Sequence, residues 1–111
     1  MSQIGFATSA RRTIKMESEA VAALEERIGA DFERACELLL QTQGRVIVTG
    51  MGKSGHIARK IAATLASTGT PAFFVHPGEA SHGDMGMITP QDSVIALSNS
   101  GAVAEIVSLL P

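Results

Sequence analysis

Aromatic residues and excess positive charge are both scarce in this sequence. Among its 111 residues there is no tryptophan and no tyrosine, and there are only four phenylalanines. Aromatic rings are what proteins use to stack on unpaired bases, so little such surface is available. Nine Lys and Arg against eleven Asp and Glu leave a formal net charge of −2, with no basic block. Both shortages argue against nucleic acid as a partner.

Cysteine is almost absent as well. Cys36 is the only one, so no disulfide can form within the chain, and a cytoplasmic location is expected. Its place in a helical pattern indicates a small core residue rather than a nucleophile. The N-terminal residues hold no continuous apolar run of the kind found in signal peptides or membrane spans, so we expect neither.

Proline is missing from residues 4–43, and glycine occurs there only at Gly5 and Gly29. Apolar residues recur at helical spacing on both sides of Gly29. We therefore predict two consecutive helices within a helical segment 1–43, with Gly29 ending the first and Asp31 capping the second.

The pattern changes after Gly44. Short apolar runs at 45–49, 72–75 and 93–97 have strand length, and helical spacing follows the first and the third of them. Buried strands alternating with helices predict the α/β class, a three-layer doubly wound parallel sheet, in a β/α part spanning 44–111. The last predicted helix reaches Pro111 with no stop signal, so we expect a truncated domain or an edge covered by another subunit.

The loop Gly50–Gly55 follows the first predicted strand and begins a helix. Gly52, Lys53 and Ser54 would offer backbone N–H groups, a hydroxyl and an ammonium to a phosphate-like anion. The loop also fits the G-x-G-x-x-G dinucleotide pattern, but His76 stands after the second strand where an acidic residue would bind the ribose. A tight turn that binds no ligand is the alternative.

A second polar turn follows the third predicted strand. It consists of Ser98, Asn99, Ser100 and Gly101. Its hydroxyls and glycine could also hold an anion, although such residues are common in turns. Because parallel strands end at one edge of a sheet, we predict that the two turns converge on one crevice.

Two further residues are candidates for acid–base chemistry. His82 lies in a polar segment at the same sheet edge, and Glu105 lies near the start of the last predicted helix. A capping or surface role is the alternative for each. The acids and histidines of residues 76–84 lack a recognised ligand spacing, so we expect no metal and no cofactor.

Three stretches together resemble the sugar isomerase (SIS) domain family, and within it the bacterial D-arabinose-5-phosphate isomerases. They are GMGKSGHIARKIAATLASTGTP at 50–71, HPGEASHGDMG at 76–86 and VIALSNSG at 94–101. The resemblance spans essentially the whole chain, which corresponds to the front part of the family proteins. The rest of the SIS domain and the tandem CBS domains that usually follow are absent from these 111 residues.

The resemblance implies interconversion of D-arabinose 5-phosphate and D-ribulose 5-phosphate through an enediolate, for lipopolysaccharide or capsule sugar (Kdo) synthesis. It implies that Lys53, His82 and Glu105 are catalytic and that Ser98, Ser100 and Gly101 hold the phosphate. It also implies a homotetramer.

Ala102 and Val103 depart from the family's usual S-x-S-G-E-[ST] cradle, and each hydrogen bond lost to the phosphate would cost about 1.5–3 kcal/mol. We therefore expect this chain by itself to be a weak or inactive isomerase. A non-catalytic sugar-phosphate sensor is the alternative function, and a dinucleotide-binding module is a weaker one.

Overall fold

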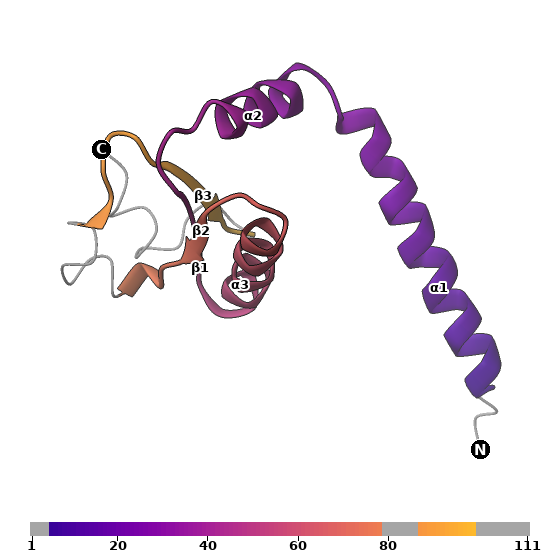
Figure 1. Cartoon of the computed structure of the whole chain (residues 1–111). Helices are drawn as coiled ribbons and strands as arrows, with labels where there is room; N and C mark the ends of the chain where they lie inside the picture. The colour runs from indigo at the N-terminus through magenta and orange to yellow at the C-terminus, as the bar shows by residue number, and fades with distance from the viewer. Residues whose placement is uncertain (1–4, 79–86, 100–111) are drawn as a thin grey trace. The chain divides into compact units, whose positions relative to one another are not determined.

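The computed structural model describes residues 5–78 and 87–99. The chain divides into two compact units, Met1–Glu37 and Leu38–Pro111, which are described separately below (Figure 1).

The first unit is helical. Helix α1 (Phe6–Ala23) continues into a short 3-10 turn, η1 (Leu24–Arg27), and α2 (Ala30–Leu40) begins after Gly29. The prediction of two consecutive helices is confirmed. The predicted cap is wrong: Asp31 lies inside the first turn of α2, because the carbonyl of Gly29 already accepts the first helical hydrogen bond, from the N–H of Glu33 at 3.1 Å.

Neither helix of this unit has a buried residue. Cys36, expected in a core, is a free thiol that is only half-buried. Within the described residues, no helix is both long and apolar enough to span a bilayer.

The second unit is built on a parallel sheet. Strand β1 (Val46–Gly50) leads through helix α3 (Gly52–Ser67) to β2 (Ala72–Phe74), and β3 (Ser93–Leu97) follows. The strand order is β2-β1-β3, and both pairings with β1 are parallel. The predicted parallel α/β arrangement is confirmed, while the helix expected over 102–110 lies outside the described residues.

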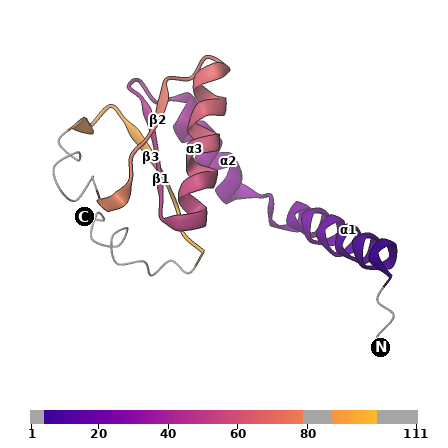
Figure 2. The same cartoon turned by 90° about the horizontal axis from the view of Figure 1, so that it is seen from below.

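The core forms around β1, whose five residues are all buried. Val46 and Val48 face one side of the sheet and pack on Ala58 and Ala62 of α3, which lies along that side (Figure 2). Ile47 faces the other side, where it packs on Val75. The small side chains of α3 let the helix lie close to the strand, so β1 and the start of α3 are held as one piece.

Arg45 and Asp92 join the amino ends of β1 and β3. The carboxylate of Asp92 accepts the backbone N–H of Arg45 at 2.7 Å and that of Thr89 at 2.9 Å. The Arg45 guanidinium lies 3.8 Å from the same carboxylate, donates to the carbonyl of Met87 at 2.9 Å and covers the ring of Phe73 at 4.7 Å. The backbone N–H of Arg45, followed by that of Thr89, lowers the pKa of Asp92.

This lowered pKa predicts an acid-sensitive contribution to stability. When the pKa of a carboxyl is lower in the folded chain than in the unfolded chain, ionisation of that carboxyl stabilises the fold. The full contribution is present at pH values above the pKa of the unfolded chain, about 3.9, and it is lost as the pH falls through the pKa of the folded chain. Asp92→Asn removes one anionic acceptor, so we expect the variant to be less stable than the parent at pH 7 and the difference to shrink below about pH 4. Urea unfolding of both proteins at a series of pH values measures this difference in the free energy of unfolding.

Ala63→Ser, an exposed change on α3 that removes no ionisable group, is the control and should leave the pH profile of unfolding unaltered. An equal stability difference for Asp92→Asn at pH 7 and pH 3 would contradict the interpretation.

Candidate functional site

The carboxyl ends of β1 and β3 lie side by side. Gly50 at the end of β1 is the register partner of Leu97 at the end of β3, so the loops that follow begin at one level of the sheet. In a sheet ordered β2-β1-β3, the chain leaves β1 toward β2 on one side, and β3 is added on the other side of β1. The strand order therefore reverses between β1 and β3, and open α/β sheets bind their ligands at such a point. The two strand ends lie together, whereas the convergence of the two turns on one crevice stays a prediction, since Ser100 and Gly101 lie outside the described residues.

The loop after β1 is shaped by close backbone contacts. A Cβ atom at Gly50 would lie 2.9 Å from the carbonyl of Ser54, and one at Gly55 would lie 2.7 Å from the carbonyl oxygen of Gly50. Gly52 has φ +56°, a left-handed conformation that strains other residues. The tight entry into α3 therefore requires these three glycines even without a ligand.

The packing does not explain two other features of the start of α3, its missing side-chain cap and its lysine. Its N-cap residue is Met51, whose side chain makes no capping hydrogen bond. Lys53 is exposed in the first turn and has no ion-pair partner among the described residues. A positively charged residue opposes the helix dipole there, and an uncapped N-terminus leaves N–H groups for an anion.

The remaining charges of α3 have the same sign. The helix contains Lys53, Arg59 and Lys60 as well as His56, and no acidic residue. Arg59 covers the ring of Phe74 at 4.1 Å, which holds its guanidinium against the edge of β2. The start of α3 is therefore an electropositive surface suited to an anionic ligand.

The segment after β2 is hydrogen-bonded to β1 just before that loop. The backbone N–H of Val75 donates to Val48 at 3.0 Å, and the buried hydroxyl of Thr49 donates back to the carbonyl of Val75. Next along the chain, Nδ1 of His76 accepts the backbone N–H of Gly78 at 3.0 Å. His76 is not among the predicted site residues; the His-Pro pair directly after a strand is the signal that could have marked it as a cap.

Only some of the predicted site residues lie within the part of the chain that the structure describes. Gly52, Lys53 and Ser54 form the first turn of α3, and half-buried Ser98 with exposed Asn99 follows β3 directly. Ser100, Gly101, His82 and Glu105 lie outside the described residues. Residues 5–78 and 87–99 contain no grouping of three or more His, Cys, Asp or Glu side chains that could hold a metal.

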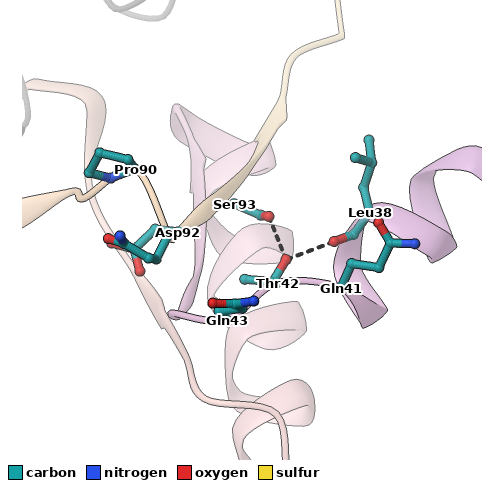
Figure 3. A pocket seen from close by; sticks show the side chains of 8 residues that line it. Leu38, Gln41, Thr42, Gln43, Pro90, Asp92 and Ser93 are labelled. Atoms are coloured by element: carbon teal, nitrogen blue, oxygen red, sulfur yellow. Dashed lines mark hydrogen bonds between the residues drawn. The ribbon is translucent and has the colours of Figure 1, made fainter.

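A hollow of about 340 Å³ opens at the opposite, amino edge of the sheet (Figure 3). The hydroxyl of Thr42 donates to the carbonyl of Leu38 at 2.8 Å and is hydrogen-bonded to the hydroxyl of Ser93. The hollow is otherwise lined by glutamine side chains, Pro90 and Asp92. Its hydroxyls and its carboxylate are already paired, and the described residues that line it include no cation for a phosphate, so we do not assign the site to it.

Comparison with known proteins identifies the sequence pattern. Residues 39–111 match the SIS domain family. Over 112 aligned residues covering the whole chain, 70% are identical to the arabinose 5-phosphate isomerase KdsD of Pseudomonas aeruginosa, of which 34% is covered. The KdsD of Escherichia coli K12 is 57% identical over 96% of this chain and 32% of its own length. The chain thus spans about a third of the length of these curated relatives.

The fold is also that of a solved protein. An Escherichia coli CFT073 structure in complex with arabinose 5-phosphate superposes with a TM-score of 0.80 at 45% identity, covering 97% of this chain and 59% of that one.

The contact between the glycine loop and α3 can be tested by substitution. In Gly55→Ala the added methyl would press on the backbone carbonyl of Gly50, which has no flexible end that could move aside. We expect the free energy of unfolding to fall by about 1–3 kcal/mol, as for an overpacked core.

Ala63→Ser, on the exposed side of the same helix, should change it by less than about 0.5 kcal/mol. Chemical denaturation of the parent and the two variants compares their free energies of unfolding. Equal values for the parent and Gly55→Ala would contradict the close contact between Gly55 and the carbonyl of Gly50.

Proposed function

The chain belongs to the SIS domain family, and on that premise we propose that it is the N-terminal part of an isomerase that interconverts D-arabinose 5-phosphate and D-ribulose 5-phosphate. The observation that carries the proposal is the electropositive, uncapped start of α3 beside the end of β3, at the point where chain connections diverge. The names of the KdsD relatives and the arabinose 5-phosphate bound in the related structure support this choice of substrate.

In the proposed reaction, the turn after β3 holds the phosphate. Ser98, Asn99, Ser100 and Gly101 would supply hydroxyl, amide and backbone donors to its oxygens. Gly52 and Ser54 would add donors from the start of α3. Binding the phosphate in this way positions the sugar chain across the end of β1.

The chemistry requires removal of the C2 proton of the open-chain aldose and reprotonation at C1. A carboxylate is a suitable base for the proton, and we assign this role to Glu105. The ammonium of Lys53 would stabilise the developing enediolate oxygen, and His82 would act as acid or base in opening the ring or moving a proton between the oxygens. No metal or cofactor is needed for this sequence of proton transfers.

The proposal includes assembly into a tetramer and a place in the cytoplasm. Helix α1 has apolar side chains that stay exposed within its unit: Phe6 is 91%, Ile14 65% and Val21 66% exposed. Exposed apolar side chains on a helix of this length are typical of a surface that a further copy covers. The free thiol of Cys36 is compatible with a reducing compartment. Synthesis of lipopolysaccharide or capsule sugar is the pathway we propose for the product.

Lys53 allows a direct test of the proposed chemistry. In the gene product at its full length, Lys53→Met removes the charge near the enediolate, and we expect the turnover number to fall by about 100-fold to 1,000-fold. Lys60→Met removes a charge from the same helix more than a turn away and should retain turnover within about twofold. Ketose formation from D-arabinose 5-phosphate is followed for both, and equal turnover in the two variants would overturn the role of Lys53.

Glu105 separates an enzyme from a sensor. Glu105→Gln keeps the size of the side chain and removes the base, so we expect binding of D-arabinose 5-phosphate to persist while isomerisation is lost. Calorimetric titration and the ketose assay measure the two properties. The interpretation as a non-catalytic sensor would be favoured if the parent protein bound the sugar phosphate without converting it and the variant behaved identically.

A further inference from the structure

The ring of Phe74 packs on the first turns of α3. Phe74 is the register partner of Val48, so its side chain lies on the face of the sheet that α3 covers, and it packs on the core formed there. Its Cζ atom lies 3.8 Å from the position that a Cβ atom on Gly55 would take. Because Gly55 has no side chain, the tip of the ring lies close to the backbone of α3 at this turn.

Arg59 covers the same ring. Its guanidinium carbon lies 4.1 Å from the ring centroid of Phe74. Arg59 follows Gly55 by four residues, which is about one helical turn. The ring is half-buried, whereas Arg59 is exposed. Helix α3 therefore contacts the ring at two neighbouring turns, through its backbone at Gly55 and through a cation–π contact at Arg59.

The start of α3 depends on this contact, because few other side chains fix it among the described residues. The N-cap residue Met51 makes no capping hydrogen bond, and Lys53 is exposed. Gly55 is the first buried residue of the helix. A Cβ atom there would meet two groups, the carbonyl oxygen of Gly50 at 2.7 Å and the ring of Phe74. Packing at Gly55 therefore sets the orientation of the turn that carries Lys53.

We propose that Phe74 is a positioning residue for isomerisation: with Arg59 over its ring, it holds the first turn of α3 so that the Lys53 ammonium meets the developing enediolate oxygen. The inference rests on the proposed function and deepens it, because it identifies what fixes the charge that stabilises the transition state. Such a charge must be held close to its productive position, and a displacement of about 1 Å can cost about 100-fold in rate. Phe74 acts through Lys53 and not by contact with the substrate.

Two substitutions with matched controls test this role in the gene product at its full length. Phe74→Leu removes the ring and keeps an apolar side chain on β2. Its control is Phe73→Leu, the same change at a half-buried neighbour that faces the other side of the sheet, where it packs with Ile47. Arg59→Met uncovers the ring of Phe74 and removes one charge. Its control is Lys60→Met, which removes a charge from the next residue of α3.

For Phe74→Leu we expect the turnover number to fall about tenfold. The KM for D-arabinose 5-phosphate should stay within about threefold of the parent, because the turn after β3 supplies most donors to the phosphate. Arg59→Met should lower turnover about threefold, and both controls should stay within about twofold of the parent. In the Lys53→Met background, Phe74→Leu should change turnover by less than about twofold, because the group through which it acts is gone.

Amide hydrogen exchange measures the positioning without any turnover. Peptides that cover residues 51–56 should exchange faster in Phe74→Leu than in the parent, because the first turn of α3 opens more often when its packing is weakened. Phe73→Leu should leave the exchange of these peptides at the parental rate.

Equal losses of turnover in Phe74→Leu and Phe73→Leu would overturn the proposal, since a general loss of stability would then explain both. Effects of Phe74→Leu and Lys53→Met that multiply in the double variant would overturn it as well, because Phe74 would then act independently of Lys53. Parental exchange at residues 51–56 in Phe74→Leu would have the same consequence.

If Phe74→Leu fails to fold, Arg59→Met and Lys60→Met decide the proposal by the same comparisons. A loss of turnover confined to Arg59→Met supports it, and equal turnover in these two variants overturns it. Isomerisation by the parent is assayed alongside. Its absence contradicts the proposed function, whereas hydrogen exchange at the start of α3 judges the role of Phe74 independently.

Discussion

Burial of β1 on both of its faces is the constraint on which the described sheet depends. Its alternate side chains pack on α3 on one side and on Val75 on the other, and both neighbouring strands pair with it rather than with each other. A strand buried on both faces has no polar side that could turn toward water, so its register is strongly specified. Because α3 leaves β1 through a turn of close backbone contacts, the position of Lys53 follows from that register.

The position of the candidate site follows from the order of the strands and from the edge of the sheet at which described charged groups are left unpaired. Arg45 and Asp92 join β1 to β3 at their amino ends through paired charges and backbone hydrogen bonds. At the carboxyl ends the opposite holds: α3 starts without a side-chain cap and carries only basic groups. The amino edge of the sheet therefore satisfies its polar groups internally, whereas the carboxyl edge has N–H donors and positive charge that are suited to an anion.

Much of this arrangement could be predicted from sequence because its signals are local. The apolar run at Val46–Thr49, the glycines that follow and the helical spacing after Ile57 each describe one element, and parallel alternation then brings the strand ends together. The predicted cap at Asp31 is wrong because the helical hydrogen bonds begin two residues earlier, at the carbonyl of Gly29, which places Asp31 inside the first turn of α2. The contact of Asp92 with Arg45 joins residues 47 positions apart, and the imidazole of His76 depends on a turn geometry that composition does not reveal.

We propose that the crevice at the carboxyl edge binds a sugar phosphate and that a proton is then moved between the first two carbons of the sugar. The most direct test of this proposal is proton NMR of D-arabinose 5-phosphate in heavy water with the gene product at its full length. We expect D-ribulose 5-phosphate to form and solvent deuterium to enter C1 of the ketose, since the enediolate is reprotonated there. Saturation of the protein with the sugar phosphate, with neither ketose formation nor exchange at C2, would contradict it.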